Sequence, residues 1–100
     1  MKIFKQIGLA YRAKKITLGT DKIIELGKKG KLNLIIISDQ ASYNTQKLIQ
    51  DKLETTNIPM IIVNDEKQQL AQSIGKKNVK VLAIQDKGFA KTMLKTTKGE

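Results

Sequence analysis

The chain has 100 residues, of which 40% are hydrophobic and 28% charged, and its formal net charge is +10 at pH 7. This length provides for a single domain with one hydrophobic core. No apolar run approaches the roughly 20 residues that span a bilayer, and no secretory signal is recognisable, so we expect a cytoplasmic protein without membrane contact. Cysteine and histidine are both absent, which excludes disulfides, Cys/His zinc sites and histidine-based catalysis.

Helical and extended patterns alternate from the amino terminus. Apolar residues recur at helical spacing over residues 2–13, which predicts an amphipathic helix. A short extended piece over residues 16–18 ends at Gly19. Thr20 is expected to cap a second helix, which Gly30 ends.

The middle of the chain predicts two buried strands that flank a helix. The apolar run over residues 32–37 contains three consecutive isoleucines, which is typical of a strand buried on both faces. Ser42 is placed to cap the helix, which ends near residue 55. Residues 60–63, after the only proline, predict the second buried strand.

The last third predicts a helix, a third strand and a final helix. Asp65 and Gln68 have the spacing of a capping box, which would open the first of these helices. Residues 79–84 predict the strand, and Asp86 is placed to cap the last helix. We expect residues 95–100 to fray as a short basic tail. The alternation indicates one α/β domain over residues 1–100, with an ordered core at about 2–94 and helices on both faces of a small sheet.

Catalytic motifs are not evident. Asp39, Asp65 and Asp86 each follow a predicted strand, so they would hold a divalent metal if the strands were parallel. Helix capping and loop hydrogen bonds explain the same residues without a ligand, and we favour that interpretation. The sequence lacks a Walker A loop, GxGxxG and GxSxG. We therefore predict no enzyme, no metal site and no cofactor.

Positive charge is concentrated at the two ends of the chain. Residues 1–31 have nine basic and two acidic side chains, and residues 67–100 have eight basic and two acidic ones. Residues 32–66, in contrast, have two basic and five acidic side chains. Lysines that merely keep the surface soluble would explain part of this excess, but a charge this large favours a polyanionic partner. Only four aromatic residues occur, so a platform for stacking single-stranded bases is not indicated, and structured RNA remains.

The segment from Lys14 to Lys22 is suited to a sugar-phosphate backbone. It combines lysines with a glycine and a predicted helix amino terminus, whose free N–H groups and positive dipole end attract phosphate. Asp21 is an acceptor for a base edge, and Lys22 is a donor to a base or a phosphate. Helix capping by Thr20, with Asp21 favoured in the first turn, explains these residues equally well.

Several separated motifs occur in a fixed order along the chain. They are Lys15-Ile16 with Gly19-Thr20-Asp21, Gly30, the Leu34–Ile37 strand with Asp39, Ile58-Pro59, Leu70 to Gly75 and Val81-Leu82-Ala83-Ile84. In this order the chain resembles the archaeal ribosomal-protein family that binds kink-turn RNA. The stretches from Gly8 to Lys15 and from Asp86 to Ala90 resemble the bacterial YlxQ-type branch more specifically. The resemblance covers about residues 3–94.

The resemblance implies a three-layer α/β/α sandwich around a mixed, mostly four-stranded sheet. It also implies an RNA site where the start of the second helix meets the loop before the last core strand. Gly19 and Thr20 match the family's Gly-Thr-Asn-Glu segment, whereas Asp21 stands at the Asn position, Lys22 at the Glu position and Glu25 at the position of a supporting Lys. Asp accepts but cannot donate, so these exchanges change the hydrogen bonds offered to a guanine edge.

The loop that packs against a flipped-out base in the family maps to residues 76–80, and Val79 is its apolar residue here. The resemblance and the charge together predict that the fold joins both basic chain ends into one RNA-binding surface. Its candidate residues are Lys14, Lys15, Gly19, Thr20, Asp21, Lys22, Glu25, Lys28, Asp39, Lys76, Lys77, Asn78, Val79 and Lys80.

These patterns predict a monomeric, non-catalytic protein that binds structured RNA, either a kink-turn-like fold or ribosomal RNA. A ribosome-associated protein-interaction or assembly factor on the same scaffold, with little RNA specificity of its own, is the alternative. A recognition module related to those fused to RNA methyltransferases is a more distant one.

Overall fold

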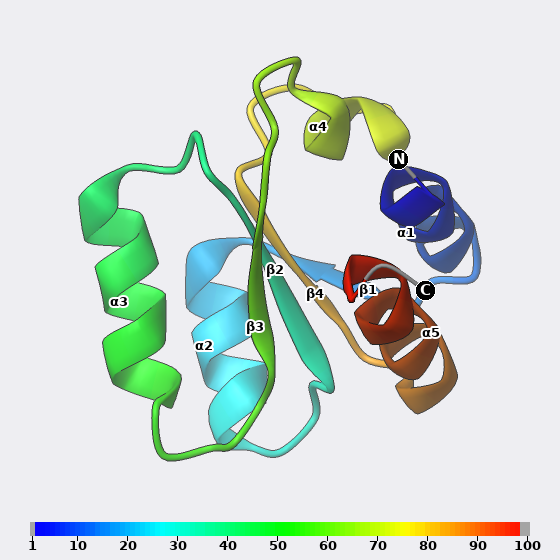
Figure 1. Cartoon of the computed structure of the whole chain (residues 1–100). Coiled ribbons are helices and arrows are strands. Elements are labelled where there is room, and N and C mark those ends of the chain that lie inside the picture. The colour runs from blue at the N-terminus through cyan, green and yellow to red at the C-terminus, as the bar shows by residue number, and fades with distance from the viewer. Residues whose placement is uncertain (1, 99–100) are drawn as a thin grey trace.

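The computed structural model describes residues 2–98, in which helices and strands alternate (Figure 1). The helices are α1 (Lys2–Arg12), α2 (Thr20–Lys28), α3 (Tyr43–Leu53), α4 (Gln69–Ser73) and α5 (Lys87–Thr97). The strands are β1 (Ile16–Leu18), β2 (Leu34–Ser38), β3 (Met60–Val63) and β4 (Val81–Ile84).

The four strands form one mixed sheet in the order β1-β4-β2-β3. Strands β2 and β3 are parallel, whereas β4 is antiparallel to both of its neighbours. The carboxyl ends of β1, β2 and β3 therefore lie at the same edge of the sheet as the start of β4. We call this the site edge. The other edge, where β4 ends, is called the opposite edge.

Helices cover both faces of the sheet, so the protein is a three-layer α/β/α sandwich, as the resemblance implies (Figure 1). Side chains of β2 alternate between the layers, because successive residues of a strand point to opposite faces. Ile36 packs in the cluster formed with α1, α4 and α5, whereas Ile35 and Ile37 pack in the cluster formed with α2 and α3.

The prediction of a buried strand is confirmed for β2 and wrong for β3. All five residues of β2 are buried between the two helical layers. Strand β3 is an edge strand with only β2 as its neighbour, and 53% of Ile62 is exposed. An apolar run does not reveal how many neighbours a strand has, which explains the error.

Two of the predicted helix caps are confirmed and one is wrong. The side chains of Ser42 and Asp86 accept hydrogen bonds from the backbone N–H groups of Thr45 and Phe89. Thr20 is not a cap, because it is the first residue of α2, and Gly19 occupies the capping position.

The predicted capping box of α4 is also wrong. Helix α4 begins at Gln69, and Gln68 precedes it in a left-handed conformation with φ 56°. Asp65 instead accepts a hydrogen bond from the backbone N–H of Leu70 at 2.9 Å, from outside the helix. The antiparallel sense of β4 places Asp86 at the opposite edge, far from Asp39 and Asp65. In residues 2–98, no group of acidic side chains is arranged to hold a metal ion.

The carboxyl-terminal helix is longer than expected. Helix α5 continues to Thr97, although residues 95–100 were predicted to fray. Residues 99 and 100 of that predicted tail lie outside the described residues. Among residues 2–98, no helix has the length and apolar character needed to cross a membrane.

Candidate nucleic-acid interface

Two segments that are distant in sequence meet at the site edge. They line a common cavity of about 290 Å³. Leu18, Gly19 and Thr20 contribute the turn from β1 into α2, and residues 78–81 contribute the loop that enters β4. Thr45 of α3 completes the lining. The adjacency follows from the antiparallel register, in which Leu18 lies opposite Leu82.

Gly19 allows the chain to turn directly from β1 into α2. Its φ of 91° belongs to a region that side-chain-bearing residues rarely adopt. A Cβ atom at Gly19 would meet nothing within 4 Å, so backbone conformation and not crowding requires the glycine here. The open space also leaves the backbone accessible to a ligand.

The amino terminus of α2 has no side-chain cap within the described residues. Gly19 has no side chain to accept the hydrogen bonds, so the N–H groups of the first turn remain available to an anion. Asp21 and Lys22 are exposed on that turn. The ammonium group of Lys22 lies 3.8 Å from the Glu25 carboxylate, which also pairs with Lys29 at 3.3 Å.

The loop before β4 is fixed at both of its ends. The N–H of Lys76 donates to the carbonyl of Ala71 at 3.0 Å, which ends α4, and the carbonyl of Lys80 accepts from Ser38 at 2.8 Å. Asn78 has a φ of 60°, a left-handed conformation that Asn tolerates better than most residues. Val79 is half-buried and packs against the core, and it also lines the cavity. These backbone hydrogen bonds join the loop to α4 and β2, and the pairing of β4 with β1 places it beside the start of α2.

A hydrogen-bond network joins the ends of β2 and β3 at the site edge. The Asp39 carboxylate accepts from the N–H of Asp65 at 2.9 Å and from the side chain of Gln40 at 3.0 Å. The bond from Asp65 and, to a lesser degree, that from Gln40 lower the pKa of Asp39 below its ordinary value, because both favour the charged form. Asp65 itself is 1% exposed. The network fixes the start of the segment that leads through α4 into residues 76–80.

The structure separates three predicted lysines from this cavity. Lys14 and Lys15 precede β1, and Lys15 lies about 13 Å along an extended chain from Gly19. The carbonyl of Lys15 accepts a hydrogen bond from Gln85 at 2.8 Å, which places it at the opposite edge. Lys28 is at the carboxyl end of α2 and lines a different cavity with Asn57. The expected single basic surface is therefore divided between two edges.

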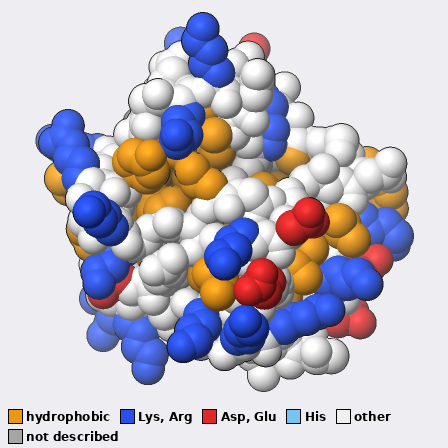
Figure 2. Space-filling model, turned by 180° about the vertical axis from the view of Figure 1, so that it is seen from behind, with side chains coloured by type: hydrophobic (Ala, Val, Ile, Leu, Met, Phe, Trp, Pro, Cys, Tyr) orange, Lys and Arg blue, Asp and Glu red, His pale blue; other side chains and the backbone are white. Residues whose placement is uncertain are grey.

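Lysine and arginine side chains are spread widely over the face of the molecule shown in Figure 2. Figure 2 shows apolar side chains gathered below the top of the molecule, with basic side chains around them and a further basic band along the lower margin. Lys76, Lys77 and Asn78 line a second cavity, of about 500 Å³, beside α4. The remaining predicted residues, Asp21, Lys22, Glu25 and Asp39, lie on exposed positions of α2 or at the end of β2.

Sequence reasoning did not identify two features of the surface. Thr45 lines the cavity at the site edge, but in the sequence it is only the third residue after a capping serine. Three lysines of α5, and Lys98 just after its last residue, line a cavity with Asn33. Their regular spacing is visible in the sequence, whereas the position of Asn33 beside them depends on the sheet order.

Comparison with known proteins agrees with this fold. Residues 1–94 match the model of the ribosomal protein L7Ae/L30e/S12e/Gadd45 family. The chain is 34% identical over 94 residues to the RNA-binding protein YlxQ of Bacillus subtilis (strain 168), covering 94% of this chain and 93% of that protein. It is 36% identical over 90 residues to the RNA-binding protein YlxQ of Enterococcus faecium, covering 90% and 85%.

Solved structures show the same architecture. A Bacillus halodurans protein of unknown function superposes with a TM-score of 0.90 at 29% identity, covering 97% of both chains. The Giardia lamblia 15.5kD RNA binding protein superposes with a TM-score of 0.76 at 14% identity, covering 96% of this chain and 84% of that one, which shows the fold alone. This protein thus has the α/β/α sandwich found in an RNA-binding protein. The chain belongs to the ribosomal protein L7Ae/L30e/S12e/Gadd45 family, and both of these relatives are named as RNA-binding proteins.

Proposed function

We propose that the protein binds structured RNA, a kink-turn-like fold or a segment of ribosomal RNA, at the site edge. The observation that supports this most directly is the cavity formed jointly by the start of α2 and residues 78–81. The net charge of +10 supports a polyanionic partner, and the YlxQ relatives are named as RNA-binding proteins.

Phosphates and bases of the RNA contact different parts of the site edge. The uncapped first turn of α2 receives a phosphate, because its N–H groups and dipole favour an anion. Gly19 allows the sugar-phosphate strand to approach the backbone closely. Lys76 and Lys77 attract the opposing strand, and Val79 presents an apolar surface to an unstacked base. A bent RNA satisfies both sides of the cavity better than a straight duplex does.

The reversed charges at Lys22 and Glu25 change the base specificity. Relative to the family pattern, the acidic and basic positions of α2 are exchanged, and the two side chains still pair at 3.8 Å. Lys22 presents a donor where the family presents an acceptor. The preferred RNA therefore presents an acceptor, such as guanine O6 or N7, at this position.

Gel-shift titration with a kink-turn RNA and a straight duplex of equal length tests the proposal. Between about 50 mM and 200 mM salt, affinity for both RNAs should fall steeply, because phosphate contacts release counterions. The wild-type protein should prefer the kink-turn RNA at both concentrations. A ribosomal RNA fragment as a third probe distinguishes the two kinds of target. Equal affinity for every probe would refute recognition of shape.

A charge reversal at the site edge locates the interface. Lys77→Glu changes an exposed loop residue and should weaken binding of the preferred RNA on the order of tenfold. Lys52→Glu makes the same charge change at the far end of α3 and is the matched control. Circular dichroism verifies that both variants fold. Equal losses in the two variants would show that only total charge matters.

A further inference from the structure

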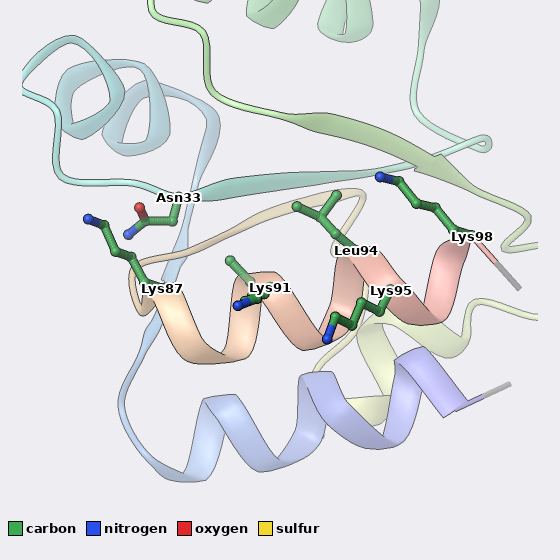
Figure 3. A pocket seen from close by; sticks show the side chains of 7 residues that line it. Asn33, Lys87, Lys91, Leu94, Lys95 and Lys98 are labelled. Carbon is green, nitrogen blue, oxygen red and sulfur yellow. The ribbon is translucent and has the colours of Figure 1, made fainter. Parts of the chain in front are cut away.

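Helix α5 presents a row of lysines beside a cavity of about 450 Å³ (Figure 3). The cavity is also lined by Asn33, Ala90 and Leu94, and Leu94 packs against the core with part of its surface still accessible. Figure 3 shows the lysine side chains projecting from successive turns of the helix, with Leu94 directed away from α1. The lysines are Lys87, Lys91, Lys95 and Lys98.

The spacing of these lysines produces a continuous line of positive charge. They recur every three or four residues, so neighbouring Cα atoms are about 5–6 Å apart along the helix, and the row is about 16 Å long. Residues 87–98 contain no acidic side chain. The ion pairs in the described part of the chain lie on α2 and α3. The α5 row is therefore not neutralised by carboxylates of its own helix.

The row continues into the opposite edge of the sheet. The side chain of Asn33 donates a hydrogen bond to the carbonyl of Gln85 at 2.6 Å, and the N–H of Gln85 donates to the carbonyl of Lys15 at 2.8 Å. These bonds hold the first turn of α5 close to the segment that contains Lys14 and Lys15. Asp86 is the neighbouring acid, and its side chain accepts from the N–H of Phe89 at the helix cap.

We propose that the surface formed by Lys87, Lys91, Lys95 and Lys98 is a second RNA site, which binds the phosphodiester backbone of a stem that extends beyond the site edge. The proposal rests on the proposed function, since it concerns the same RNA. Flexible ammonium groups in a line suit successive phosphates and require no particular base. Protein interfaces are instead enriched in Arg, Tyr and Trp and depleted in Lys, and these lining residues include no Arg, Tyr or Trp. Charge and composition thus favour RNA over a protein partner.

The dimensions of the molecule determine which RNA reaches both sites. The domain measures 29 × 28 × 25 Å, so a stem must extend over a similar distance, about one turn of an A-form helix, to pass from the site edge to α5. The experiment therefore compares a kink-turn RNA with stems longer than one turn and the same RNA with shorter stems. A straight duplex of the long length is the third probe.

The test variant is Lys91→Gln/Lys95→Gln, and Lys47→Gln/Lys52→Gln on α3 is the control with the same charge change. For the long-stem RNA, the α5 variant should bind on the order of tenfold more weakly, and its slope of log affinity against log salt should be shallower by about 1.5. For the short-stem RNA, both variants should match the wild type. Unchanged affinity and slope on the long-stem RNA would overturn the proposal.

The remaining outcomes separate this proposal from the proposed function. If wild type does not prefer kink-turn RNA, but the α5 variant loses affinity for the long duplex, the site edge is misassigned and the α5 site stands. If the α5 variant binds every RNA normally but no longer binds poly-glutamate, the surface accepts acidic peptides and the RNA proposal is overturned.

Discussion

The site edge and the α5 surface are both basic, but they are built in different ways. At the site edge the backbone leaves common conformations, with φ values of 91° at Gly19, 67° at Gly75 and 60° at Asn78. The α5 surface is one regular helix with lysines at helical spacing. The difference indicates that recognition of a shape requires a specific backbone path, whereas attraction of charge requires only a regular element. Substitutions that disturb this backbone path should therefore affect stability, and substitutions of the α5 lysines should not.

The largest effect is expected from Asp65→Ala. Its carboxylate accepts from the buried N–H of Leu70, and the substitution would leave that donor without a partner. We expect the free energy of unfolding to fall by about 2 kcal/mol, as measured by urea denaturation. Asp51→Ala, at an exposed position of α3, should change it by less than about 0.5 kcal/mol. Equal effects would contradict the structural role of Asp65.

Gly19→Ala should have the next largest effect. Space for a methyl group is available, but the φ of 91° is unfavourable for alanine, so we expect a loss of about 1 kcal/mol. Thr20→Ala is the matched control and should be within about 0.5 kcal/mol of wild type, because Thr20 is not the helix cap. If Thr20→Ala lowers the free energy of unfolding as much as Gly19→Ala does, Thr20 is the helix cap after all.

On α5, Lys91→Gln/Lys95→Gln should alter unfolding free energy by less than about 0.5 kcal/mol, because both side chains are exposed. Thermal and urea unfolding of the double variant provide the measurement. Destabilisation as large as that of Asp65→Ala would remove the distinction between a strained site and a regular charged helix.

The smallest effect concerns pH. Folding lowers the pKa of Asp39, so its charged form stabilises the fold above the unfolded-state pKa, near 4, and that contribution disappears as pH falls through the lower folded-state value. The wild-type Tm should therefore exceed that of Asp39→Asn at pH 7, and the difference should shrink below about pH 4. A difference that stays constant down to pH 2 would show that the charge of Asp39 is not responsible.

Local patterns in the sequence predicted much of the fold. The isoleucine run identified the central strand, and Ser42 and Asp86 identified two helix starts, because capping depends on residues within one turn. The same local reasoning failed at Asp65, whose acceptor role involves a backbone N–H five residues away beyond a left-handed Gln68. Nothing in the sequence distinguishes that arrangement from a capping box.

The candidate site was predictable in part, because the turn at Gly19 and the lysine-rich loop are both visible in the sequence. The resemblance implied that they meet, and the meeting depends on β4 lying between β1 and β2, an order that periodicity alone does not reveal. The strand directions also place Lys14 and Lys15 at the other edge, against expectation. The distribution of charge along the sequence shows that both ends of the chain are basic, but only the topology determines which lysines share a surface.

The position of β4 also has a consequence for folding during synthesis. This strand is the last of the four described strands along the chain, yet it is inserted between two earlier ones, and Ile84 pairs with both Ile16 and Leu34. A nascent chain on the ribosome therefore lacks the partner of β1 until most of its length has emerged. Closing such long loops is characteristic of slow-folding topologies. The cavity between α2 and the loop before β4 consequently forms only after β4 has emerged.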